Sequence, residues 1–144
     1  ILARVRGAEH PDGVLPLVGL AEVAGAKSDL QAARTLYEQA LVLAASRPGD
    51  RAHVLFALGQ LDLEAQDWDS AIDRYREARV VFADAEMWRV MLTETWVGEG
   101  RALAGRGDAA LARDALSLAR ALAEQDPPMP EFFTAIDETL ASLR

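Results

Sequence analysis

The sequence predicts an all-α chain, an α-solenoid of about three antiparallel helix hairpins followed by a C-terminal capping helix. Three observations predict this fold class. Ala, Leu, Arg and Glu dominate the 144 residues, and all four are strong helix formers. One spacing of small and large residues recurs three times in phase. Short Pro- or Gly-containing breaks separate the helical stretches, which indicates hairpins.

The recurring spacing places an alanine, a large residue and a second alanine at i, i+4 and i+7, so all three share one helix face. The third copy is the most degenerate, because Leu replaces Tyr. The first alanines of the copies are 38 and 41 residues apart. The three copies are Ala33, Tyr37 and Ala40; Ala71, Tyr75 and Ala78; and Ala112, Leu116 and Ala119.

A small residue occupies the equivalent place in the helix before each copy, namely Ala21, Gly59 and Gly100. Gly within a helix costs about 1 kcal/mol relative to Ala, so a glycine there indicates close packing. We expect the first alanine of each copy to face the small residue, and the tyrosines to fill the space between successive hairpins.

The elements follow in order from the breaks. Residues 1–13 are predicted to be the remnant of a preceding helix and its turn, because Pro11 and Gly13 mark a break; a frayed terminus is the alternative. A first helix is predicted from Leu15, with Pro16 tolerated in its first turn. The repeats are predicted over residues 14–47, 52–85 and 86–126, and the whole of 1–144 as one domain.

Each predicted hairpin has a turn between its two helices. Ser28-Asp29 is expected to cap the second helix of the first hairpin, since Ser and Asp are good N-caps. The second hairpin is expected to turn at Gln66-Asp67, and the third within residues 105–108, after a first helix over 86–104.

A last helix is predicted after the proline-rich stretch 127–130, within residues 130–144. A solenoid needs an end piece that keeps one face in water. Charged residues lie mostly off the apolar stripe, so this helix fits the role of a cap. The stripe consists of Phe132, Phe133, Ile136, Leu140 and Leu143.

Residues 14–126 resemble the tetratricopeptide repeat family, in a long-unit bacterial form, because the spacings exceed the family unit of about 34 residues. The resemblance implies a groove lined by the first helix of each hairpin. The groove residues expected on these helices are Leu15, Val18 and Glu22; His53, Phe56 and Gln60; and Glu94, Val97 and Arg101.

Phe56 is the expected centre of binding, with His53 and Arg101 around it, because an aromatic residue beside an arginine is typical of interface hot spots. The alternative is that Phe56 packs on the adjacent hairpin. Some relatives hold a terminal carboxylate with Lys and Asn. Val18 and Glu22 stand at those places in the first unit, so this clamp is not expected.

The predicted function is a non-catalytic protein–protein interaction module that binds a peptide or helix of a partner in its concave groove. The alternative is a regulatory, sensor or self-association segment of a larger bacterial signalling protein, such as a kinase or transcription regulator. The net charge of −8 predicts a neutral or basic partner segment. Self-association is expected at the N-terminal face, which the remnant helix would leave apolar.

Composition argues against several classes of function. The negative net charge disfavours nucleic acids and anionic membranes as partners. No apolar run reaches the length of a membrane span, and a cytoplasmic location is expected. Cysteine is absent, and His10 and His53 lie on separate segments, so neither a metal site nor a cofactor is predicted. No catalytic residues are predicted.

Overall fold

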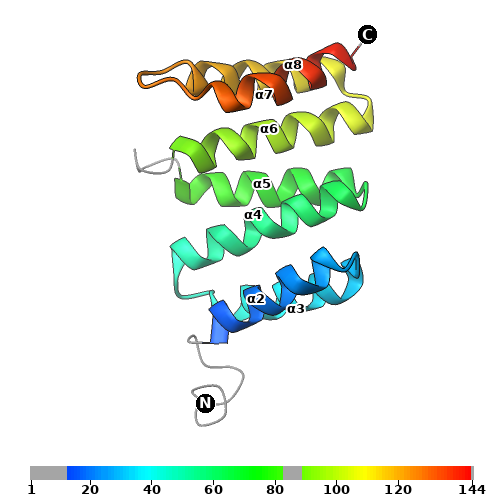
Figure 1. The fold of residues 1–144 in the computed structure, drawn as a ribbon, viewed down its shortest axis with the longest axis vertical. Coiled ribbons are helices and arrows are strands. Elements are labelled where there is room, and N and C mark those ends of the chain that lie inside the picture. The colour runs from blue at the N-terminus through cyan, green and yellow to red at the C-terminus, as the bar shows by residue number, and fades with distance from the viewer. Residues whose placement is uncertain (1–12, 83–88, 144) are drawn as a thin grey trace.

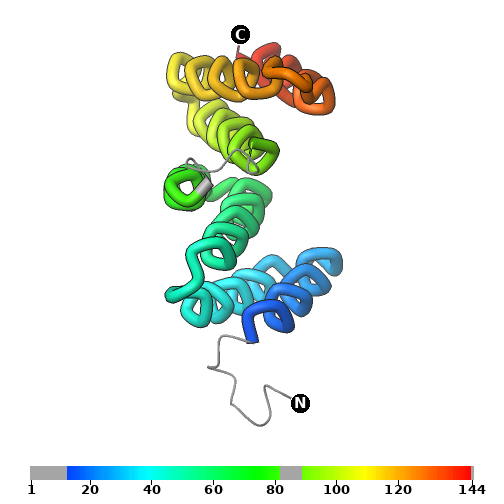
Figure 2. Tube along the Cα trace, turned by 90° about the vertical axis from the view of Figure 1, so that its left-hand side faces the viewer, coloured from blue at the N-terminus to red at the C-terminus, as the bar shows by residue number. Residues whose placement is uncertain are grey.

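The structure, a computed structural model, describes residues 13–82 and 89–143, and every element in these ranges is helical. Consecutive helices pack as hairpins that stack in chain order, with α2 and α8 at opposite ends (Figures 1 and 2). The predicted all-α solenoid of three hairpins and a final helix is confirmed. The elements are α2 (Val14–Ala26), α3 (Leu30–Leu43), α4 (Pro48–Glu64), α5 (Trp68–Phe82), α6 (Arg89–Arg106), α7 (Ala109–Ala123), the 3-10 helix η3 (Pro130–Phe132) and α8 (Phe133–Ala141).

The three hairpins turn in the same way. The residue before the aspartate of each turn has a left-handed backbone, with φ of 60° at Ser28, 60° at Gln66 and 95° at Gly107. The N–H of the aspartate then donates to a carbonyl five residues earlier, which closes a Schellman motif. These bonds are Asp29 to Ala24, Asp67 to Asp62 and Asp108 to Leu103, each 2.9 Å.

The glycines in the first helices pack against the second helix of the same hairpin, as predicted. The large side chain of that helix, rather than the side chain of its alanine, comes nearest to each glycine. A Cβ at Gly59 would lie 3.0 Å from Cε1 of Tyr75, and one at Gly100 would lie 2.8 Å from Cδ2 of Leu116. Ala112 does face Gly100, because its carbonyl oxygen would lie 3.6 Å from that Cβ. At both glycines the atoms nearest to the Cβ position belong to a larger side chain, and for Ala71 the expectation stays a prediction. The long side chain one turn later fills the hollow that the missing Cβ leaves.

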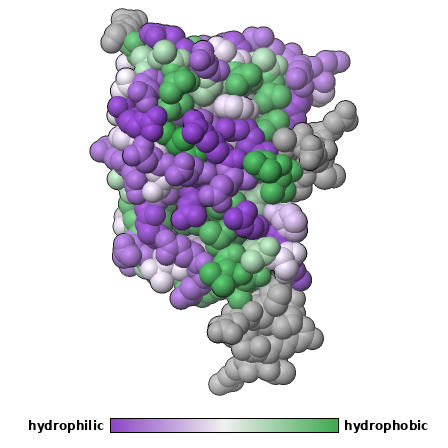
Figure 3. Space-filling view, turned by 180° about the vertical axis from the view of Figure 1, so that it is seen from behind, coloured by the Kyte–Doolittle hydropathy of each residue, from purple (hydrophilic) through white to green (hydrophobic). Residues whose placement is uncertain are grey.

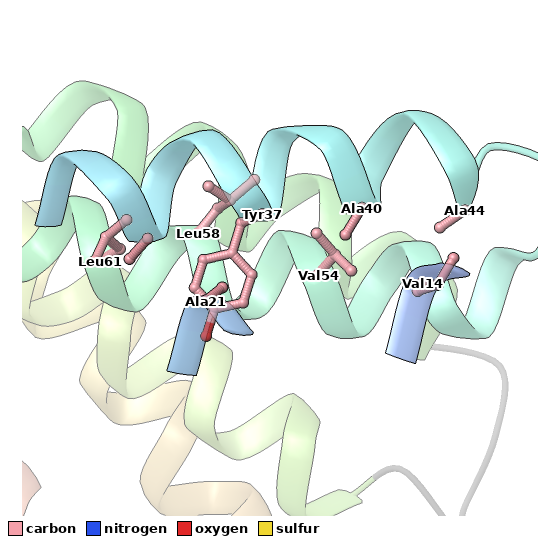
Figure 4. Packing of buried hydrophobic residues seen from close by; sticks show 9 residues of the cluster. Val14, Ala21, Tyr37, Ala40, Ala44, Val54, Leu58 and Leu61 are labelled. Carbon is pink, nitrogen blue, oxygen red and sulfur yellow. The ribbon is translucent and has the colours of Figure 1, made fainter. Parts of the chain in front are cut away.

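The first hairpin packs in the same way around Tyr37. Its ring lies beside Ala21 in a core shared by α2, α3 and α4 (Figure 4). Tyr37 is 8% exposed, and the equivalent Tyr75 is 1% exposed. Tyr75 also lies against Gly98 on α6, so its ring fills the space between two successive hairpins, as predicted.

Arginines cross each interface between hairpins and pair with buried carboxylates. Arg34 on α3 lies 2.5 Å from the fully buried Asp62 on α4. Burial raises the pKa of Asp62, and Arg34 opposes that shift. Between the second and third hairpins, Glu99 on α6 accepts a 2.8 Å bond from Arg76 and a second bond from Arg79.

The last helix is held much like the first helix of a further repeat. Arg79 on α5 pairs with Glu99 and lies 3.4 Å from the centre of the Trp96 ring. Arg120, at the equivalent place on α7, pairs with Asp137 of α8 and lies over the ring of Phe133, also on α8. Of the predicted stripe, Ile136 is fully buried and the other members are partly buried. Those others are Phe132, Phe133, Leu140 and Leu143.

Three helix ends differ from the expected ones. Helix α4 begins at Pro48 rather than at residue 52, because Pro is well suited to the first helical turn. Helix α6 continues to Arg106, past Gly105, where the ring of Trp68 packs so closely that a Cβ would lie 2.7 Å from Cε2. A 3-10 turn precedes α8, so the regular helix starts at Phe133.

Two predictions fall outside the described residues. The remnant helix at residues 1–12 is one, and the start of the third repeat at residues 86–88 is the other. Among the described helices, none is long and apolar enough to cross a membrane. Hydrophilic residues predominate on the face seen in Figure 3, and apolar residues form smaller separate patches there.

Candidate functional site

All nine predicted groove residues line one or both of two adjacent cavities. The first, here called the C-terminal cavity, has a volume of about 400 Å³. Helix α6 contributes Glu94, Val97 and Arg101 to it, and the C-terminal segment contributes Phe132 and Ala135. Because α4 and α5 of the second hairpin also line it, the cavity is formed where the second and third hairpins meet the C-terminal segment.

The second, here called the N-terminal cavity, has a volume of about 550 Å³. Helix α2 contributes Leu15, Val18 and Glu22, and α4 contributes His53. Met91 of α6 also lines it, so this cavity reaches all three hairpins. It is the more apolar of the two by residue type.

Phe56 and Gln60 of α4 line both cavities. They lie one helical turn apart, so they share a face and form a ridge between the two hollows. The structure thus brings the nine predicted residues together along one surface. We call this surface, the two cavities with their ridge, the groove.

Exposure separates these nine residues into three groups. Leu15 is 75% exposed, while Val18, Phe56 and Glu94 are half-buried. Val97 is only 6% exposed and packs in a core cluster with Leu116 and Ile136, so it serves mainly as core rather than as an open groove floor. The remaining polar members are exposed, namely Glu22, His53, Gln60 and Arg101.

Phe56 shows parts of both predicted roles. Its ring meets that of Tyr75 edge to face, with centroids 5.9 Å apart and an interplanar angle of 64°. It also packs with Met91 and Leu92 of the next hairpin around a shared core cluster. The side chain is half-buried and lines both cavities, so it combines packing with a surface contribution.

Sequence reasoning missed several residues of the C-terminal cavity. Glu64 continues the face of Phe56 and Gln60 at i+8, and this spacing was a usable signal. Tyr75 comes from a second helix, where the repeat pattern predicts packing only. Phe132 reaches the cavity from η3, and no spacing in the sequence indicates that contact.

The groove carries more negative than positive charge. Four carboxylates line it, from Glu22, Asp50, Glu64 and Glu94. Arg101 is the cation of the C-terminal cavity among the described residues. Burial raises the pKa of Glu94.

The hydroxyl of Tyr75 lies in the field of these charged groups. Burial is the main cause that raises its pKa; Arg101 opposes the shift, and Glu94 and Glu64 add to it. Three charged residues that line the C-terminal cavity therefore interact electrostatically with the hydroxyl of Tyr75. Within the described part of the chain, no cluster of three His, Cys, Asp or Glu side chains could hold a metal ion.

Comparison with protein families matches residues 14–79 to a family model described as a tetratricopeptide repeat. This match covers the first two hairpins up to Arg79 of α5. The third hairpin repeats their turn, with the same 2.9 Å bond, and has the same filled small position. No curated protein and no solved structure gave a significant match to the chain.

Proposed function

The chain belongs to the tetratricopeptide repeat family, whose members are in general non-catalytic scaffolds for protein–protein interaction, and we propose that it binds a peptide or helix of a partner protein in the groove. The ridge of Phe56 and Gln60 would lie under the middle of the bound segment. The cavities on either side would take its side chains.

One observation carries this proposal. Nine residues chosen for their places on three separate helices line two hollows that share a ridge. A cavity with apolar walls and a few charged groups is the usual form of a site for side chains. The half-buried ring of Phe56 at the shared ridge is typical of a binding hot spot.

Charge supports a neutral or basic partner segment. Four carboxylates and one arginine line the groove, and the chain as a whole carries a net charge of −8. Complementary charge speeds association and disfavours acidic competitors. A basic segment would therefore bind faster at low salt than at high salt.

The test is selection of a phage-displayed peptide library on the wild-type chain, followed by affinity measurements on variants. Phe56→Ala removes the ridge ring, and Gln60→Arg places a long cation at an exposed ridge position. The matched control is Gln39→Arg, an exposed position on α3 that lines neither cavity of the groove.

We expect both ridge variants to weaken the selected peptides by about tenfold or more. The control should bind like wild type. Thermal melts followed by circular dichroism show whether Phe56→Ala stays folded. If Phe56→Ala unfolds, Gln60→Arg still tests the groove, because its substitution is at an exposed position. Unchanged affinity in a folded ridge variant contradicts the groove as the binding surface.

A second candidate function, self-association, is favoured by the outer face of α2. Leu20 and Val23 on this face are 57% and 52% exposed. In the second hairpin the equivalent Leu58 and Leu61 are buried against the first hairpin. The α2 face thus has the form of a stacking surface. It carries no charge at Gly19, Leu20 or Val23, so two copies could meet there without repulsion.

Light scattering over a wide concentration range tests this second candidate. Leu20→Glu should abolish any dimer, because it places a charge at the centre of the apolar face. Leu118→Glu, at a site 48% exposed on α7, is the control and should leave the dimer intact. A wild-type chain that stays monomeric at all concentrations contradicts self-association.

A further inference from the structure

Three aromatic rings line the C-terminal cavity, and each comes from a different element. Phe56 lies on α4, Tyr75 on α5 and Phe132 on η3. The edge-to-face pair of Phe56 and Tyr75 fixes one wall. Aromatic walls of this kind attract cations and pack well against the methylene stem of a lysine or arginine.

Glu94 supplies a carboxylate to the same cavity. It is half-buried, yet it forms no hydrogen bond or ion pair with another described residue. The two fully buried carboxylates of the described chain differ from it. Asp62 has Arg34 as its partner, and Glu99 has Arg76 and Arg79. Glu94 is thus a partly desolvated acid that has no cationic partner among the described residues.

Arg101 does not fill that role, although it lines the same cavity. It follows Glu94 by seven residues on α6, which places it about 10 Å further along the helix axis. Its side chain is exposed. Glu64 is a second carboxylate of the cavity, so the lining stays net negative even with Arg101 counted.

We propose that the C-terminal cavity is a cation site that takes a lysine or arginine side chain of the partner. Its charged group would pair with Glu94, and its methylene stem would lie among Phe56, Tyr75 and Phe132. This inference rests on the proposed function for the source of the cation. The pocket chemistry itself can be tested without any partner.

The first experiment uses n-butylammonium, which reproduces the head and stem of lysine, and n-butanol as its neutral counterpart. Both are titrated into the ¹⁵N-labelled chain, and the amide signals of Val97 and Gly98 beside the cavity are followed. We expect n-butylammonium to shift these signals saturably and n-butanol to have little effect. Glu94→Gln should abolish the response, whereas Glu38→Gln, an exposed control on α3 that lines no cavity of the groove, should retain it.

The second experiment uses groove-dependent peptides from the library selection. Each lysine or arginine is replaced by norleucine, and affinity is measured with wild type, Glu94→Gln and Glu38→Gln. At one basic position, norleucine should weaken binding to wild type and to the control by about tenfold. On Glu94→Gln the same replacement should change affinity by less than about threefold, because the pairing carboxylate is absent.

The outcomes separate the two proposals. The cation site is overturned if norleucine weakens peptide affinity equally for wild type and Glu94→Gln. It is also overturned if the groove-dependent peptides contain no basic residue. In both cases the groove remains the binding surface. An n-butylammonium response that survives in Glu94→Gln, or no response at all, overturns the cation site as well. If no groove-dependent peptide emerges, the proposed function fails, and the n-butylammonium titration still decides whether the cavity binds cations.

Discussion

The ring of Tyr75 on α5 lies directly against the backbone of Gly98 on α6. A Cβ at residue 98 would come within 2.5 Å of Cε2 and 2.7 Å of the hydroxyl oxygen of Tyr75. The same ring covers Gly59 on the opposite side. One aromatic side chain thus joins the second hairpin to the third through two glycines, and it also lines the C-terminal cavity.

This contact predicts that Gly98→Ala destabilises the chain. The added methyl group must displace a ring that is 1% exposed, and overpacking of a tight core typically costs about 1–3 kcal/mol. The control is Gly19→Ala, at the equivalent place on α2, where a Cβ would meet no atom within 4 Å. There the better helix propensity of Ala should stabilise the chain by about 0.5–1 kcal/mol. Urea titration measures the free energy of unfolding of both variants. Equal changes in that free energy would contradict the role of Gly98 in packing.

The shared turn geometry predicts that Gln66→Gly is stabilising. Gln66 has a φ of 60°, a conformation that is costly for residues with a Cβ and natural for glycine, as at Gly107 in the third turn. We expect a gain of about 0.5–1 kcal/mol in the free energy of unfolding.

The reciprocal change, Gly107→Ala, isolates the backbone effect. A Cβ at Gly107 would meet nothing within 4 Å, so any loss arises from its φ of 95°. It should destabilise by about 1–2 kcal/mol. Thermal unfolding measures the melting temperatures of both variants. If both melting temperatures changed in the same direction, the shared turn geometry would be contradicted.

The Arg79–Glu99 pair predicts that substitutions of its two residues have non-additive effects on the free energy of unfolding. Glu99 is 3% exposed, so Glu99→Leu leaves Arg79 buried without its partner and should cost about 3–5 kcal/mol. The equivalent places in the first interface are Leu41 and Leu58, which pack together in one apolar cluster.

The double variant Arg79→Leu with Glu99→Leu should therefore recover most of the lost stability, because it creates the same kind of leucine contact that occupies the equivalent places in the first interface. Arg76, the second partner of Glu99, has a side chain 54% exposed and can be solvated. Guanidinium titrations of both single variants and the double variant measure the coupling. Additive losses would show that the two interfaces are not equivalent.

The hairpins and their turns could be predicted because local rules determine them. The i, i+4, i+7 spacing defines one packed face, and the aspartates at 29, 67 and 108 are of a residue type favoured directly before a helix. The nine groove residues were chosen by helix phase together with the family resemblance, which implies a groove along the first helices, and their role in binding stays a prediction.

The remaining features depend on contacts between distant elements. Whether Tyr75 or Ala71 meets Gly59 depends on how far a side chain reaches, which spacing does not specify. Glu99 is buried only because two arginines on another helix neutralise it. Phe132 joins the cavity because η3 folds back over the third hairpin, and no periodicity indicates that contact.

The last prediction concerns pH and Glu94. Burial raises the pKa of its carboxyl in the folded state, so the folded chain binds the proton more tightly than the unfolded chain does. Its contribution therefore lowers the free energy of unfolding as pH rises from the ordinary carboxyl pKa of about 4.3 through the raised value. Above that pH range the ionised group destabilises the folded chain by a constant amount, and below it Glu94 is protonated in both the folded and the unfolded state.

Glu94→Gln, which keeps the shape and removes the charge, should raise the melting temperature at pH 7. This gain should shrink towards zero as the pH falls below the ordinary carboxyl value. The exposed control Glu38→Gln should leave the melting temperature at pH 7 close to that of wild type. A variant less stable than wild type at pH 7 would mean that Glu94 is already paired in the free chain, and the carboxylate would then not be available for a partner's cation.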